Sequence, residues 1–235
     1  MASERHSPVV FKDPRKFGRI GTAAQQEVFD QFGQVYPTEN ESLSFVNGVS
    51  RTATGGAAVV RSACAEYRTL VDYGSDNELT LDLKKVAAMI AAELPTRLFY
   101  VNQGGYDHHA SQPGLHQTQL IYLSDALHGF MADLKRIGRA DDVAIMVFSE
   151  FGRRVEENAS QGTDHGTAGP MLVLGPGVAG GMYGTLPSLE DLDDGNLVMT
   201  TDFRSVYATM LGEWMGFDGV QQVLKGEFET LPIFS

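Results

Sequence analysis

The spacing of apolar residues predicts helices in the second half of the chain. Apolar side chains recur three and four positions apart in three segments, residues 79–94, 119–138 and 201–216. This spacing places them on one face of an amphipathic helix. Pro95 is expected to end the first helix, and Thr201 or Asp202 to cap the start of the third.

Three further apolar runs predict buried strands, because they lack the alternation of a half-exposed strand. They cover residues 97–103, 143–150 and 170–177. Buried strands separated by amphipathic helices are typical of an α/β fold with a doubly wound, mostly parallel sheet flanked by helices. We expect this fold over residues 79–235.

The first third of the chain has a less regular pattern of apolar residues. Residues 1–78 begin with a mixture of Pro, Gly, Gln and charge that has no sustained period, which predicts irregular structure and short helices. An Ala-rich stretch then predicts a helix after Gly55 and Gly56. We do not expect residues 1–78 to form an independent domain.

Polar side chains gather at the ends of the predicted strands. Asp107 and His109 follow the first strand, Glu150 ends the second, and Asp164 and His165 precede the third. In a doubly wound sheet, ligands bind beyond the carboxyl ends of the strands. These loops are therefore expected to converge on one site.

The residue types in these loops indicate a divalent metal. In an extended backbone Asp107 and His109 point to the same side, and His165 is the best third ligand. Carboxylate and imidazole suit zinc or manganese. We call Asp107, His109 and His165 the metal triad. The alternative for each histidine is a hydrogen bond to the backbone.

Glu150 is either a metal ligand or a base, or it is only the first solvated residue of its loop. Arg153 either holds an anion or pairs with nearby acidic residues.

The composition of the chain limits the classes of molecule that it can bind. The chain has 235 residues and a formal net charge of −12, which disfavours nucleic acid but allows small anionic substrates held by a metal. Cys64 is the only cysteine, so no internal disulfide forms. No apolar run reaches membrane-spanning length, and the start lacks the pattern of a secretion signal, so the chain as given is expected to be soluble and cytoplasmic.

The order of these motifs resembles a known family. Residues 104–112, 128–178 and 200–216 are similar to the bacterial family catalogued as domain of unknown function 1501, within the alkaline phosphatase-like superfamily. The resemblance implies an alkaline phosphatase-like α/β fold and hydrolysis of phosphate or sulfate esters. It also implies up to two divalent ions. It adds calcium to zinc and manganese as a candidate metal.

The resemblance assigns roles by order along the chain. Asp107 and His109 match the first carboxylate–histidine pair of the superfamily, and His165 matches the last histidine. Glu150 stands where the superfamily often has Asp followed by His, so Phe151 occupies the histidine position.

A second alignment assigns Asp164 and His165 to the Asp-His pair, which makes Asp164 a further candidate metal ligand. We prefer the first alignment because that pair normally follows its strand directly, as Glu150 does. Nothing in residues 1–78 resembles the family's nucleophile segment. Members of the family are usually longer and often exported, which leaves the compartment of this protein open. The chain therefore resembles an N-terminally truncated member that keeps one metal site.

Three functional hypotheses follow. The first is a metal-dependent hydrolase of phosphate or sulfate esters, in which the metal triad binds the ion that activates water, Glu150 binds a second ion or acts as base, and Arg153 steadies the anion. Its rival is a non-catalytic remnant or binding module. A glycosidase would use Glu150 with Asp107 or Asp164, which leaves the histidines without a role.

Overall fold

The computed structural model describes residues 10–18, 21–33 and 40–234. The chain divides into two compact units: residues 1–70 with 80–101, and residues 71–79 with 102–235. All the candidate site residues belong to the second unit. The predicted division into residues 1–78, which are not expected to form an independent domain, and an α/β domain over residues 79–235 stays a prediction.

Helices build the first unit. They are a short 3-10 turn η1 (Pro14–Lys16), α1 (Ala23–Gly33), α2 (Glu41–Glu66) and most of α3 (Glu78–Ala91). The expected helix after Gly55 and Gly56 is wrong in its start, because α2 already begins at Glu41. Its N-cap is Asn40, whose side chain accepts the Leu43 N–H at 3.0 Å. Each glycine costs about 1 kcal/mol in a helix, and the long Ala-rich segment offsets that cost.

The helix predicted over residues 79–94 is α3. It ends before Pro95, as expected. Leu79, Leu83, Val86 and Ala87 of the predicted apolar face are buried, and so are three residues off that face: Thr80, Ala88 and Met89. Among the described residues, no helix is both long and apolar enough to cross a membrane.

A long helix organises the second unit. This helix, α4 (Gln112–Arg136), starts with a proline in its first turn, earlier than the predicted residue 119. Its C-terminal half packs on the segment that holds Tyr73, whose buried hydroxyl donates to the buried carboxylate of Asp133 at 2.8 Å. Gly129 permits this approach, since a Cβ there would lie 2.6 Å from the Asp72 carbonyl oxygen. The unit also contains η2 (Ala140–Asp142) and α6 (Val220–Leu224).

The third predicted helix begins at its expected cap. The Asp202 carboxylate accepts the Arg204 N–H at 2.9 Å, and α5 (Phe203–Thr209) follows. The helix then widens into a π turn (Met210–Trp214), which together with α5 covers most of the predicted range.

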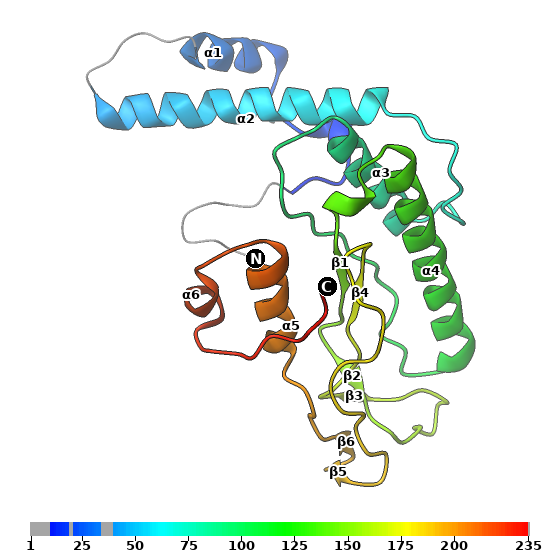
Figure 1. Ribbon diagram of the computed structural model, residues 1–235. Helices are drawn as coiled ribbons and strands as arrows, with labels where there is room; N and C mark the ends of the chain where they lie inside the picture. The colour runs from blue at the N-terminus through cyan, green and yellow to red at the C-terminus, as the bar shows by residue number, and fades with distance from the viewer. Residues whose placement is uncertain (1–9, 19–20, 34–39, 235) are drawn as a thin grey trace. The chain divides into compact units, whose positions relative to one another are not determined.

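The predicted doubly wound, mostly parallel sheet is wrong, and with it the alkaline phosphatase-like α/β architecture. The described strands form three antiparallel pairs: β1 (Ile145–Val147) with β4 (Leu172–Leu174), β2 (Gly152–Arg153) with β3 (His165–Gly166), and β5 (Leu192–Asp193) with β6 (Asn196–Leu197). Figure 1 shows β1 beside β4 and β2 beside β3. Parallel neighbours need a crossover connection, usually a helix. Residues 148–171 instead fold back through the β2–β3 ribbon, which returns the chain in the opposite direction.

The first predicted strand is also wrong. Residues 97–103 are not in a strand, and Leu98 and Tyr100 are 72% and 68% exposed. An apolar run becomes a strand only when a neighbouring strand accepts its backbone hydrogen bonds. Composition alone could not supply that neighbour.

Candidate metal centre

The β2–β3 ribbon and the loop before α4 bring the metal triad together. Asp107 and His109 lie in that loop, and His165 lies in β3, opposite Arg153 of β2. One ligand atom from each member of the triad lies within 4.8 Å of the other two. The sequence-predicted triad is thus a cluster in space.

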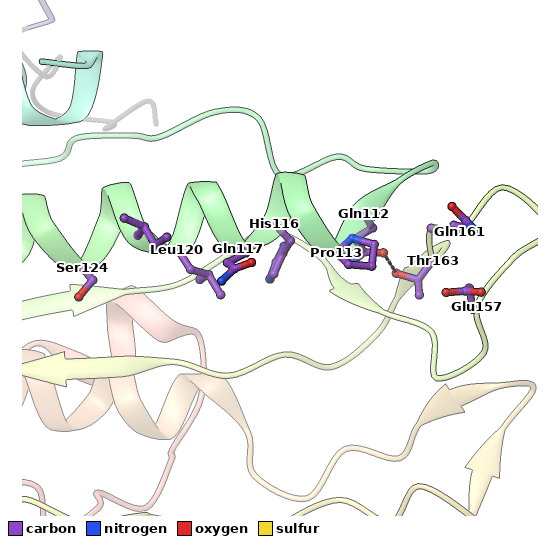
Figure 2. Close-up of a pocket in the computed structure, with 11 residues that line it drawn as sticks. Gln112, Pro113, His116, Gln117, Leu120, Ser124, Glu157, Gln161 and Thr163 are labelled. Carbon is purple, nitrogen blue, oxygen red and sulfur yellow. Dashed lines mark hydrogen bonds between the residues drawn. The ribbon is translucent and has the colours of Figure 1, made fainter. Parts of the chain in front are cut away.

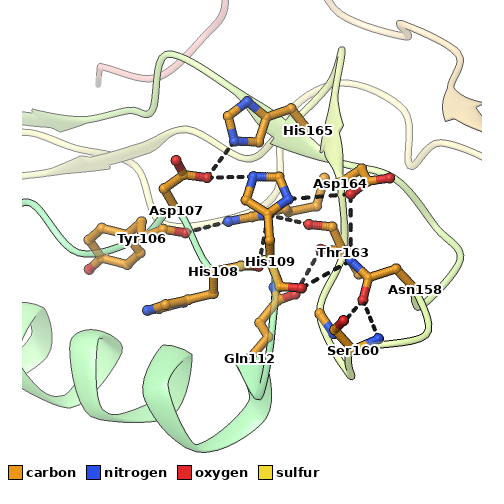
Figure 3. A network of polar contacts seen from close by, with 12 residues as sticks. Tyr106, Asp107, His108, His109, Gln112, Asn158, Ser160, Thr163, Asp164 and His165 are labelled. Carbon is orange, nitrogen blue, oxygen red and sulfur yellow. Dashed lines mark hydrogen bonds and ion pairs between the residues drawn. The ribbon is translucent and has the colours of Figure 1, made fainter.

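Asp107 is at the centre of the triad (Figure 3). Its Oδ1 lies 2.6 Å from His165 Nε2 and 2.9 Å from His109 Nε2. The two imidazole rings have centroids 5.0 Å apart. All three side chains are about half exposed or more, so an ion and a small substrate can reach them from solvent.

His109 lies between two carboxylates. Its Nδ1 is 3.3 Å from Asp164 Oδ1, while its Nε2 faces Asp107. A neutral imidazole has one N–H and cannot donate to both carboxylates. If Nε2 held a metal, the Nδ1–H would donate to Asp164, which is the usual way that proteins orient a metal-binding histidine. This geometry makes Asp164, a predicted ligand, better suited to orienting His109.

The same contacts keep both carboxylates ionised. The hydrogen bond from His165 is the main cause that lowers the pKa of Asp107 below its ordinary value of 3.8. The hydrogen bond from His109, followed by the one from Asn158, lowers the pKa of Asp164. Ionised carboxylate is the form that binds or orients metal ligands.

Arg153 supports the loops of the site. Its guanidinium donates to the backbone carbonyls of Tyr106, His108 and Thr163, with 3.1 Å to His108 O. Its Cζ also lies 4.9 Å from the centre of the Phe151 ring. These contacts join the loop before α4 to the loop before β3. The predicted role of Arg153 in holding an anion stays a prediction beside this positioning role.

Phe151 contacts the triad directly. Its ring stacks on His165, with centroids 4.0 Å apart and planes 8° apart. The residue that occupies the histidine position of the family pattern therefore packs against a triad histidine. Glu150, its neighbour, is exposed, forms no hydrogen bond or ion pair with the described residues, and is not part of the cluster.

Sequence reasoning missed Asn158. Its side-chain amide contacts both His109 and Asp164. The signal was present in the segment NASQG at 158–162, since Asn, Ser and Gly close together favour a tight turn stabilised by the Asn side chain. That signal indicates a turn but does not reveal what the turn contacts.

A groove of about 570 Å³ lies along the first turns of α4 and the 157–163 loop (Figure 2). A hydrogen bond of 2.8 Å from Thr163 Oγ1 to Gln112 Oε1 links the loop to the helix at the groove. His116 lines it, and the buried Nδ1 of this residue has no hydrogen-bond partner among the described residues. Burial lowers the pKa of His116, helped by the nearby His108 and Arg153.

One comparison with known proteins gives a match. The model of a family described as protein of unknown function (DUF1501) matches residues 49–226, a range that includes every member of the metal triad. No curated protein and no solved structure gives a significant match.

Proposed function

Since the chain belongs to the DUF1501 family of proteins of unknown function, we propose its activity from its own site: metal-dependent hydrolysis of a phosphate or sulfate ester. The observation that carries the proposal is the convergence of the metal triad. Asp107 lies in a loop and His165 in a strand, 58 residues apart in sequence, and the ligand atoms of the triad lie within 4.8 Å of one another.

The donor set suits a catalytic ion. Two imidazole nitrogens and one carboxylate oxygen resemble the three protein ligands of catalytic zinc sites, which keep a position for water or substrate. When bound, such an ion supplies a nucleophilic water at neutral pH and polarises the ester oxygen. The open face of the triad leaves room for both.

The remaining residues have separate roles in the proposal. Asp164 fixes the His109 ring, and Arg153 fixes the backbone of both loops while adding a positive charge close to the site. Glu150 is proposed as the base or as a ligand to a second ion, because it directly precedes the residue that stacks on His165.

A binding module without turnover is the second candidate. It is favoured by the high exposure of the triad and by the absence, in the described range, of a hydroxyl side chain hydrogen-bonded to any triad member. Both candidates predict metal binding, and they differ only in hydrolysis.

The test combines metal binding with hydrolysis. Zinc and manganese are titrated into the metal-free chain, and chromogenic phosphate and sulfate esters are assayed with each ion. His165→Ala is expected to abolish stoichiometric metal binding. His128→Ala, which changes an exposed histidine on α4, is the matched control and should bind as the unmodified chain does.

The outcomes separate the candidates. Metal binding with ester hydrolysis that His165→Ala abolishes supports the hydrolase. Metal binding without hydrolysis supports the binding module. Equal metal content in His165→Ala and His128→Ala contradicts both.

A further inference from the structure

We propose that Asn158 is a positioning residue for the metal triad, whose side-chain N–H groups hold His109 and Asp164 in the geometry that binds the ion. This inference rests on the proposed metal site and adds a residue that controls its affinity. Asn158 is not itself a ligand, and it acts through two residues of the site.

The Asn158 side-chain oxygen builds the loop. Oδ1 accepts the N–H of Ser160 at 2.9 Å and the N–H of Gly162 at 3.1 Å. The backbone closes the same turn, because Asn158 N–H donates to Gly162 O at 2.8 Å. These bonds shape residues 158–162 and need only an acceptor at Oδ1.

The side-chain nitrogen contacts the site (Figure 3). Nδ2 donates to His109 O at 3.1 Å and reaches Asp164 Oδ1 at 3.5 Å. The orientation of the amide is fixed, because Oδ1 faces two backbone N–H donors and Nδ2 faces two oxygen acceptors. One planar group therefore joins the loop to a triad histidine and to the carboxylate that orients it.

The loop cannot move away from the triad without losing further contacts. Ser111 N–H donates to Ser160 O at 3.0 Å, and Gln112 N–H donates to Gln161 O at 2.8 Å. Gly162 lies directly against His109, where a Cβ would be 2.3 Å from its carbonyl carbon. A change at Nδ2 is thus transmitted to His109 rather than absorbed by the loop.

The variant Asn158→Asp distinguishes the role of Oδ1 from the role of Nδ2. The new side chain keeps an acceptor for Ser160 and Gly162, but places a carboxylate oxygen against His109 O and Asp164 Oδ1. Its added negative charge would by itself tighten cation binding. Weaker binding can therefore come only from lost geometry.

The matched control is Asn196→Asp. It makes the same change in the same unit, in β6, where the amide of Asn196 donates only to Asp194 O at 3.4 Å among the described residues. Zn²⁺ affinity is measured by competition with a chromophoric chelator, and the visible spectrum of the Co²⁺ form reports ligand geometry. The thermal midpoint of the metal-free protein reports the loop.

Asn158→Asp is expected to weaken Zn²⁺ binding by about 10- to 100-fold and to change the Co²⁺ spectrum, as loss of an orienting contact does in other metal sites. Its metal-free midpoint should stay close to that of the unmodified chain. Asn196→Asp should match the unmodified chain in all three measurements. Affinity in Asn158→Asp equal to or tighter than the unmodified value would overturn the proposal.

A metal-independent measurement keeps the two proposals apart. In the metal-free protein, the His109 imidazole resonances are expected to shift in Asn158→Asp and to stay unchanged in Asn196→Asp. Unchanged resonances in Asn158→Asp would refute the role of Asn158 whether or not zinc binds. An unmodified chain that binds no zinc would refute the proposed function alone.

Discussion

The two histidines of the metal triad are held by different kinds of contact. His109 has a carboxylate at its second nitrogen, from Asp164, and an amide at its carbonyl, from Asn158. Among the described residues no carboxylate contacts the second nitrogen of His165, whose Nε2 faces Asp107, and its ring stacks on Phe151. Stacking fixes the plane of a ring, so Phe151 can do for His165 what Asp164 does for His109.

Phe151→Leu tests this function of the ring. The variant is expected to weaken zinc binding by about tenfold, because an orienting contact of His165 is lost while all three ligands remain. Zinc affinity is measured by competition titration. The same substitution at Phe217, which is 45% exposed and belongs to no site contact, should leave the affinity unchanged. Equal affinity in both variants would show that Phe151 only packs.

His116 gives a pH dependence that is separate from the metal. Its pKa in the folded chain is lowered from 6.5, mainly by burial, so the unfolded chain takes up the proton first as the pH falls. The free energy of unfolding should therefore decrease below about pH 6.5. His116→Gln should remove part of this decrease, as measured by urea unfolding at pH 7.5 and 5.5. The same pH dependence in both proteins would contradict the assignment.

At the scale of elements, close backbone approach holds the site together. A Cβ on Gly152 would lie 1.8 Å from Ala168 O, and one on Gly166 would lie 2.5 Å from the Arg153 carbonyl carbon. The β2–β3 ribbon can form this tightly only because both positions lack side chains. The ribbon and the 158–162 loop together hold His165 and His109 within reach of Asp107.

Gly162→Ala should separate the loop from His109. The added methyl group has no room, so we expect a loss of about 1–3 kcal/mol in the free energy of unfolding and weaker zinc binding. Chemical denaturation and zinc titration measure the two effects. Gly104→Ala is the control, since a Cβ there meets nothing within 4 Å. Similar stability in both variants would contradict the close packing at Gly162.

At the scale of the whole molecule, the site and the only tryptophan belong to the same compact unit. Trp214 stacks on Phe234, with ring centroids 5.3 Å apart. Its fluorescence therefore reports the unfolding of the unit that contains the metal triad, while the other unit contributes no tryptophan signal.

Zinc should stabilise this unit selectively. At about 100 times its dissociation constant, a ligand that binds only the folded state adds about 2.7 kcal/mol to the free energy of unfolding. The midpoint followed by Trp214 fluorescence should rise when zinc is added and return when a chelator removes it. His165→Ala should show no rise, and a rise of equal size in this variant would place the bound zinc elsewhere.

The amino-acid pattern predicted much of the helical structure and suggested a chemistry for the site. Helix α3 and most of α4 follow from spacings of three and four residues, which are local because a helix bonds residues four apart, and the cap at Asp202 follows from its residue type. The residue types of Asp107, His109 and His165 similarly indicated a metal before any distance was known.

The pairing of the strands and the residues that support the ligands depend on contacts between distant segments of the chain. Strand direction depends on a partner far away in sequence, so the antiparallel pairing of β1 with β4 could not be read from either apolar run. The same holds for Asn158, whose turn is local but whose contacts with His109 and Asp164 form only when separate loops meet. Local patterns set what each segment can form, and long-range contacts select among those possibilities.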